Sequence, residues 1–178
     1  MRNHSRAEKM SFASSRLSFL AEQQLPTLWL HIPVPWTFTI AYLVGIGIWF
    51  LVPVTIGSAF WLTIIQILSV LSLALGAVLA FWAQWIFRKL HTTTVPTETT
   101  TSLVTWGPYR FSRNPMYLGI FLFFAGLSGI ATFVWSILLL LAVVFYVNST
   151  VIPVEERQLR RNFGAAYEKY QSQVRRWV

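Results

Sequence analysis

Two long stretches of the chain contain no charged residue. Residues 23–87 and 114–154 hold no Asp, Glu, Lys or Arg, and apolar side chains dominate both stretches. A membrane-spanning helix needs about 20 consecutive apolar residues, so each stretch is long enough for more than one crossing. The pattern therefore predicts an all-α protein that folds as a polytopic transmembrane helical bundle.

Proline, glycine and polar residues divide these stretches into about four predicted spans. The first two are expected at 36–54 and 58–87, and the last two at 116–130 and 132–152. As one helix, the second would exceed a hydrocarbon core of about 30 Å, whereas the third is short for a full crossing. Only a few residues around Gly129 separate the third and fourth spans, which predicts a tight helical hairpin.

The last part of the chain repeats apolar residues every three or four positions, which is the spacing of one helix face. These residues are Leu159, Phe163, Tyr167, Tyr170, Val174 and Trp177. Charged residues occupy the other faces, and Gly164 is expected to divide the helix into two pieces. Such an amphipathic helix either lies on the membrane or covers a site that faces the cytosol. Periodicity alone favours the membrane surface.

The charge distribution predicts an orientation in the membrane. With both termini inside, the inside segments 1–35, 88–115 and 153–178 hold all 14 Lys and Arg, and the outside turns hold none. The positive-inside rule therefore predicts that both termini and the C-terminal segment are cytosolic. The net charge of +8 lies in clusters that flank apolar segments, which indicates contact with lipid head groups rather than nucleic acid.

Composition excludes several kinds of site. The chain has no Cys, which rules out disulfides, thiolate zinc sites and cysteine nucleophiles. His4, His31 and His91 lie far apart without the spacing of metal ligands, so no metal site is expected. The chain divides into three expected parts: an N-terminal cytosolic or interfacial segment at 1–35, the first two transmembrane helices at 36–90, and a C-terminal region with the candidate chemistry at 91–178.

A first polar cluster lies at 107–119, with the sequence Gly-Pro-Tyr-Arg-Phe-Ser-Arg-Asn-Pro-Met-Tyr-Leu-Gly. Asn114 and Pro115 fit the N-cap and the first position of a helix. The free N–H groups of that helix end, with Arg110 and Arg113 beside them, suit a carboxylate or a phosphate. The alternative is a capped transmembrane helix whose arginines reach to water.

A second polar cluster directly follows the fourth span. Glu155 and Glu156 stand where Pro153 marks the expected start of a helix, and the helix dipole favours acidic residues there. Glu156 is also spaced for an i,i+4 pair with Arg160. Two adjacent carboxylates can instead bind ribose hydroxyls, an amine or a sulfonium. Because the hairpin reverses the chain, both clusters are expected at the same cytosolic edge.

These motifs, in this order, resemble the isoprenylcysteine carboxyl methyltransferase family, which belongs with the phospholipid N-methyltransferases. The resemblance rests on 107–119, the hairpin, Glu-Glu-Arg-Gln-Leu at 155–159 and Phe-Gly-Ala-Ala-Tyr-Glu-Lys-Tyr at 163–170. It implies a methyltransferase-like region at 91–178 that binds S-adenosylmethionine (SAM) at the cytosolic side. The implied acceptor is lipophilic or lipid-linked, resembling a prenylcysteine carboxylate or a phospholipid amine.

Carried over by position, the resemblance implies a set of cofactor-binding residues: Gly107, Pro108, Tyr109, Arg113, Asn114, Pro115, Tyr117, Glu155 and Glu156. Among them Arg113, Asn114 and Glu155 are the expected catalytic residues, with Arg113 a candidate partner for the methionine carboxylate or for the substrate. Many family members have His where this chain has Asn114. An amide cannot act as a general base near neutral pH, which argues against any mechanism that needs a base at this position. The departure from the His of those family members also argues against a prenylcysteine acceptor.

Two alternatives to the methyltransferase remain open from the sequence. One is an NADPH-dependent membrane reductase of the sterol type, although those chains are much longer. The other is a non-catalytic membrane protein on the same scaffold. Gly119 and Gly126 share a helix face, where they allow close helix packing, the commoner use, or leave room for an acyl or prenyl chain. The acceptor and the oligomeric state cannot be read from the residues.

Overall fold

The computed structural model describes residues 33–54, 57–89 and 102–178. The expected N-terminal segment, except for its last three residues, and the three histidines lie outside the described residues. Every regular element in the described part is helical, which confirms the predicted all-α fold.

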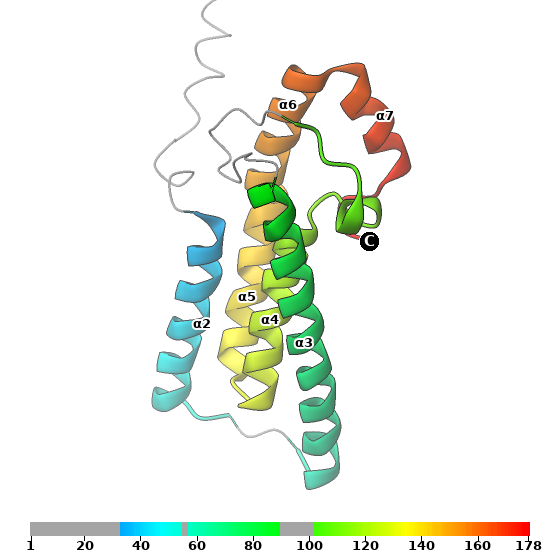
Figure 1. The fold of residues 1–178 in the computed structure, drawn as a ribbon. Coiled ribbons are helices and arrows are strands. Elements are labelled where there is room, and N and C mark those ends of the chain that lie inside the picture. Colours follow the sequence, from blue (N-terminus) through cyan, green and yellow to red (C-terminus); the bar gives the residue numbers. More distant parts are fainter. Residues whose placement is uncertain (1–32, 55–56, 90–101) are drawn as a thin grey trace, which may run out of the picture. The chain divides into compact units, whose positions relative to one another are not determined.

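Four apolar helices stand side by side and form the bundle (Figure 1). They are α2 (Val34–Leu51), α3 (Ala59–Lys89), α4 (Pro115–Ile130) and α5 (Val134–Tyr146). The helix α3 packs chiefly against α4, and α2 packs chiefly against α5. A short turn joins α4 to α5, so the predicted helical hairpin is confirmed.

Within the described residues, three helices are long and apolar enough to cross a membrane: α2, α3 and the helix that begins with α5 and runs over Val134–Phe163. The helix α4 has 16 residues and thus spans roughly 24 Å, less than a hydrocarbon core of about 30 Å. The expectation of a short third span is therefore confirmed. Residues that are exposed on these helices are largely apolar, as lipid contact requires.

Glycines bring α3 and α4 into close contact. A Cβ atom on Gly119 would lie 2.5 Å from the backbone nitrogen of Ala80, and one on Gly126 would lie 2.5 Å from that of Leu73. Such distances leave no space for a larger side chain, and small residues at helix interfaces allow this approach in membranes. The two glycines thus serve helix packing, the commoner of the two expected uses.

The fourth span continues without a break into the cytosolic segment expected after it. A π-helical turn at Val147–Val151 connects α5 to α6 (Ile152–Phe163). The prediction that a new helix begins at Pro153 is therefore wrong. A proline ring clashes with the carbonyl one turn earlier in a regular α-helix, and the wider π turn before Pro153 relieves that conflict.

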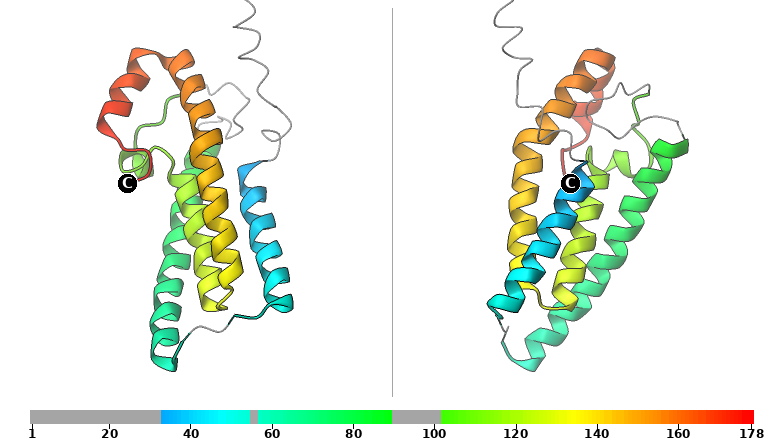
Figure 2. Two further views of the ribbon diagram at one scale, coloured as in Figure 1. Left: turned by 180° about the vertical axis from the view of Figure 1, so that it is seen from behind. Right: turned by 90° about the vertical axis from the view of Figure 1, so that its left-hand side faces the viewer.

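The helix ends at Gly164, as predicted, and α7 (Ala165–Gln173) follows. Gly164 takes a φ of +49°, which favours glycine. The helix α6 extends beyond the bundle, and α7 then folds back toward a short 3-10 helix, η2 (Gly107–Arg110) (Figure 2). The end of the bundle at which α6, α7 and η2 lie is the α7 end.

Candidate functional site

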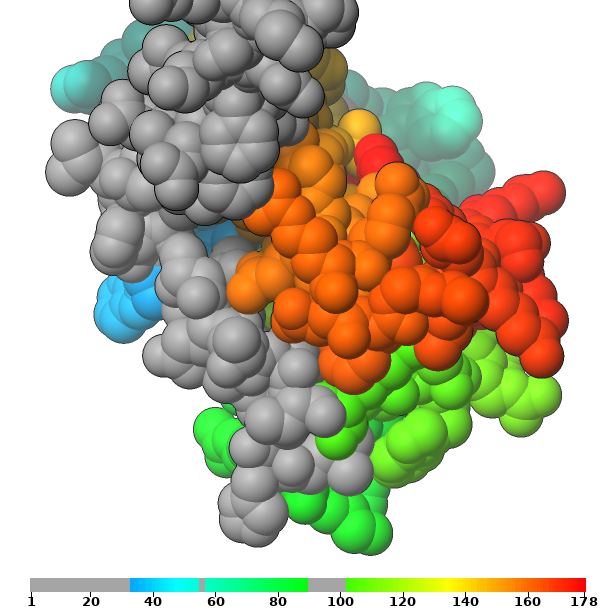
Figure 3. Space-filling view, turned by 90° about the horizontal axis from the view of Figure 1, so that it is seen from above, coloured from blue at the N-terminus to red at the C-terminus, as the bar shows by residue number. Residues whose placement is uncertain are grey.

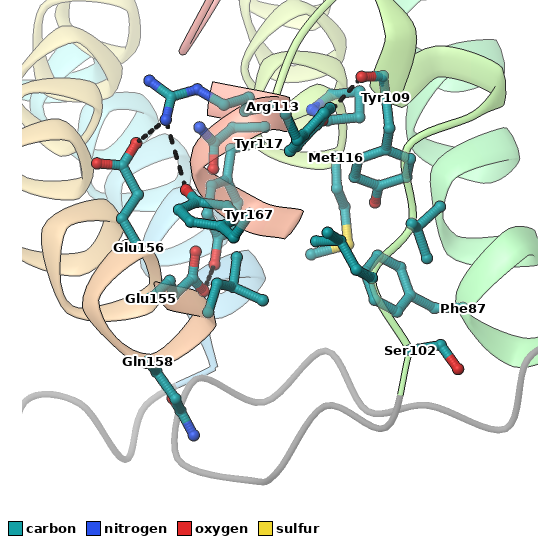
Figure 4. A pocket seen from close by; sticks show the side chains of 16 residues that line it. Phe87, Ser102, Tyr109, Arg113, Met116, Tyr117, Glu155, Glu156, Gln158 and Tyr167 are labelled. Carbon is teal, nitrogen blue, oxygen red and sulfur yellow. Dashed lines mark hydrogen bonds and ion pairs between the residues drawn. The ribbon is translucent and has the colours of Figure 1, made fainter. Parts of the chain in front are cut away.

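A cavity opens at the α7 end of the bundle, between the end of α3, residues 102–104, η2, the start of α4, and the helices α6 and α7 (Figure 4). The empty space between its walls is about 890 Å³, including the part open to solvent. Its lining residues are Phe87, Ser102, Leu103, Val104, Tyr109, Arg113, Asn114, Pro115, Met116, Tyr117, Glu155, Glu156, Gln158, Leu159, Tyr167 and Tyr170.

The hairpin brings the two predicted clusters together in this cavity. Most of the expected cofactor-binding residues line it: Tyr109, Arg113, Asn114, Pro115, Tyr117, Glu155 and Glu156. Gly107 and Pro108 are not among the lining residues. Pro108 is buried, and Gly107 has a φ of +64° and lies against Ile86 and Trp82 of α3. Both belong to η2, which packs against α3 and carries Tyr109.

The turn before α4 is tied to the C-terminal tail. Asn114 occupies the N-cap position, as predicted, but its side chain makes no capping hydrogen bond. Its amide instead donates to the carbonyl oxygen of Arg176 at 3.0 Å, and the Ser112 hydroxyl donates to the same oxygen at 3.2 Å. The turn is thereby fixed by residues far along the chain.

Glu155 contacts an aromatic hydroxyl rather than a helix end. The hydroxyl of Tyr117, a residue that is only 4% exposed, donates to Glu155 Oε1 at 2.5 Å. No Lys or Arg among the described residues forms an ion pair with Glu155. Because α6 continues α5, no helix N-terminus supports this carboxylate, and the predicted dipole role is wrong. A carboxylate without a cationic partner is suited to a positively charged ligand.

Glu156 binds two arginines that come from other elements. Arg113 Nη1 lies 3.1 Å from its Oε1, and Arg176 Nη2 lies 2.8 Å from its Oε2. The expected pair with Arg160 is wrong, since the Arg160 guanidinium donates to Gln171 at 2.7 Å. The hydrogen bond with Glu156 raises the pKa of Arg176. Two guanidinium groups thus share one carboxylate, which leaves one net positive charge.

The helix α7 covers the cavity with Tyr167 and Tyr170, two residues that were not among the expected cofactor-binding residues. Arg113 Nη1 donates to the Tyr167 hydroxyl at 3.4 Å, and the Tyr170 hydroxyl donates to the Tyr109 carbonyl at 2.7 Å. Burial raises the pKa of Tyr170, which keeps it neutral. The apolar face of α7 is therefore turned onto the cavity, contrary to the preference for the membrane surface. The helical spacing of Tyr167 and Tyr170 predicted this face, but the spacing alone does not indicate what the face covers.

Viewed from the α7 end, the helices α6 and α7 lie against the segment near residue 105 (Figure 3). This segment supplies Ser102, Leu103 and Val104 to the cavity, and Val104 packs with Ile86 and Tyr109 in a small buried cluster. No motif marks residues 102–104 or Phe87 in the sequence, because only the fold brings them to the α7 end.

The polar groups of the cavity suit a ligand that carries both signs of charge. Glu155 offers a carboxylate without a cation, and the buried Arg113 Nε has no hydrogen-bond partner among the described residues. Phenol rings of Tyr109, Tyr117 and Tyr170 provide flat walls. Among the described residues, no group of His, Cys, Asp or Glu is arranged to hold a metal ion.

A second, mostly apolar groove lies within the bundle, between α2, α3 and α4. Its lining residues are Pro35, Thr39, Ala77, Ala80, Phe81, Gln84, Trp85, Arg88, Met116, Ile120, Phe123 and Phe124. Met116 borders both the groove and the cavity, so the two spaces are neighbours. Arg88 and Gln84 are the polar groups near the α7 end of the groove.

Comparison with known proteins gives one family. A family model described as phospholipid methyltransferase matches residues 64–166, more than half of the chain, from the early part of α3 to the start of α7. The comparisons with curated proteins and with solved structures gave no match.

Proposed function

Because the chain belongs to the phospholipid methyltransferase family, we propose that it is a membrane enzyme that transfers a methyl group from SAM to a lipophilic acceptor. The cavity at the α7 end is the proposed cofactor site. One observation carries this proposal: Glu155 and Arg113 line the same cavity. Glu155 has no ion pair with a described Lys or Arg, and the buried Nε of Arg113 has no hydrogen-bond partner among the described residues.

The side chains of the cavity fit the chemical groups of SAM. Arg113 would bind the carboxylate of its methionine part, since guanidinium groups bind carboxylates with charge-assisted hydrogen bonds. Glu155 would face positive charge, and the tyrosines would provide walls for the planar base. When bound, this cofactor supplies an electrophilic methyl group on a positively charged sulfur atom.

The residues of the chain would act by positioning and by excluding water. Methyl transfer is an in-line displacement, so its rate depends on holding donor and acceptor in one geometry. The helix α7, fastened by Tyr170 to η2 and by Tyr167 to Arg113, closes the cavity against solvent. The Asn114 amide is bound to a backbone carbonyl and offers no general base. A carboxylate acceptor needs none, whereas an amine must be presented in its deprotonated form.

The groove between α2, α3 and α4 is the proposed place of the acceptor's apolar chain. It lies among membrane-spanning helices and meets the cavity at Met116. Arg88 is exposed at the same end of α3 and forms no ion pair with another described residue, so it can bind an anionic group near the reacting atom. Both acceptor types, a prenylcysteine-like carboxylate and a phospholipid with its phosphate, have an apolar chain and such a group.

The proposed orientation places the cavity on the cytosolic side. The α7 end carries Arg88, Lys89, Arg110 and the basic residues of α6 and α7, whereas the opposite turns hold no Lys or Arg. The positive-inside rule supports this arrangement, and a cytosolic cavity would have access to a soluble cofactor.

Calorimetric titration of the detergent-purified protein tests the cofactor assignment. Saturable binding of SAM and of S-adenosylhomocysteine (SAH), with no binding of NADPH, is the expected result. Binding of NADPH instead would favour the reductase, and a folded sample that binds none of the three would favour a non-catalytic scaffold. Transfer of a radiolabelled methyl group into lipid extracts or prenylated thiols would then identify the acceptor.

A further inference from the structure

The last residues of the chain form a bonded connection to the proposed cofactor site. The Arg176 guanidinium holds both carboxylate oxygens of Glu156, through Nε to Oε1 at 3.1 Å and through Nη2 to Oε2 at 2.8 Å. Its Nη1 donates to Asn148 Oδ1 at 3.3 Å, and the Trp177 indole donates to the same oxygen at 3.0 Å. Arg176 is therefore anchored to the π turn as well as to α6.

This arrangement limits what Glu156 can do for Arg113. Since both Glu156 oxygens are engaged by Arg176, Arg113 reaches only one of them, through Nη1 at 3.1 Å. The Arg113 Nε is buried and has no partner among the described residues, and the Arg113 side chain is only 11% exposed. A buried donor without a partner is costly, so this N–H is available to donate to an anionic ligand group.

Resting on the proposed function, we infer that Arg176 is a positioning residue that keeps Arg113 available for the ligand carboxylate. It does so in two ways. First, the Arg176 guanidinium binds both oxygens of Glu156, which prevents Glu156 from turning both of them onto Arg113. Second, the charge of Arg176 leaves Arg113, Glu156 and Arg176 together with one net positive charge. Without Arg176, Glu156 and Arg113 would form a neutral pair that attracts an anion weakly.

Two ligands separate this role from a purely structural one. SAH has the carboxylate, whereas its decarboxylated analogue lacks it and leaves Arg113 no anion to bind. In Arg176→Gln, we expect SAH to bind about 10- to 100-fold more weakly, the scale of a hydrogen bond between charged groups. The analogue should bind with little change. Arg176→Lys retains the charge but not the two-point contact with Glu156, and an intermediate loss of SAH affinity is expected.

A second substitution tests the route through Glu156. In the double variant Arg176→Gln with Glu156→Gln, Arg113 has no carboxylate to pair with, so SAH affinity should recover in part. Arg161→Gln is the matched control, since it removes the same charge from an exposed position on α6 and should leave both affinities unchanged. Thermal unfolding in detergent shows whether each variant is folded.

The outcomes distinguish this inference from the proposed function. Selective loss of SAH affinity in Arg176→Gln, with recovery in the double variant, supports the positioning role. Equal loss for both ligands, or no recovery, overturns it and leaves Arg176 as a structural tie. If the wild-type protein binds neither ligand, the proposed function fails and the inference fails with it.

Discussion

Replacing Glu155 by Gln probes the centre of the proposed cofactor site. The amide keeps the shape of the side chain, and its oxygen can still accept the hydrogen bond from the Tyr117 hydroxyl. The substitution therefore keeps the shape and removes the group that can carry a negative charge. If that charge faces the sulfonium, affinity for SAM should fall, whereas affinity for SAH, whose sulfur is neutral, should change much less.

The size of the effect follows from the surroundings of Glu155. Since no Lys or Arg among the described residues pairs with it, a ligand cation would meet an uncompensated carboxylate. Two unit charges 4 Å apart interact by about 4 kcal/mol at an effective dielectric of about 20, before the cost of desolvation. Hydrogen bonds to charged groups contribute about 1.5–3 kcal/mol net. A loss of roughly 10- to 150-fold in SAM affinity is therefore expected.

Parallel calorimetric titrations of wild type and variant with SAM and SAH provide the measurement. Glu168→Gln is the matched control, because Glu168 is exposed on α7 and the same charge is removed there. Unchanged SAM affinity in Glu155→Gln would refute the role of this carboxylate. An equal loss for SAM and SAH would mean that Glu155 contacts the ribose or the amine rather than the sulfonium.

Three further substitutions test the acceptor groove, the helix packing and the cover. Ala77→Trp should obstruct the groove and raise the KM for a lipid acceptor without changing SAH affinity. Ala74→Trp, at an exposed position on α3 outside the groove, should leave this KM unchanged, and equal KM values for the two variants would contradict the groove assignment. Gly126→Leu should lower the free energy of unfolding in detergent by about 1–3 kcal/mol. Gly47→Leu, at a position with open space around it, should leave stability unchanged, and identical melting curves for the two variants would contradict the close packing. Tyr170→Phe removes the hydrogen bond to the Tyr109 carbonyl in η2, which contributes about 1 kcal/mol, and should speed hydrogen exchange in α7 but not in α3. Unchanged exchange in α7 would show that this bond does not hold α7 over the cavity.

The sequence by itself determined the spans, the hairpin and the break at Gly164. The long charge-free stretches and the period of the apolar face act within single helices, so their consequences can be read locally. The hairpin also determined that Arg113 and Glu155 approach each other, because a chain that reverses must return to the end from which it came.

The partners of the charged residues were beyond the reach of local patterns. Glu156 was expected to pair within its own helix, but Arg176 follows it by 20 residues and Arg113 comes from another element. A carboxylate binds the guanidinium groups that the fold brings closest, and two that arrive from other segments outcompete one neighbour on an exposed helix face. The sequence also did not show that α6 continues α5 without a break, since a π turn accommodates Pro153 in a continuous helix.

Only the tertiary structure decided what the C-terminal face covers. A helix face made mostly of aromatic residues suits a membrane surface and a protein cavity equally well, because both exclude water. The choice depended on the buried bond from Tyr170 to Tyr109, which joins residues 61 positions apart. It depended also on the tail that fastens the turn at Asn114. Such contacts depend on where helices cross in space, which hydrophobic periodicity along one segment does not specify.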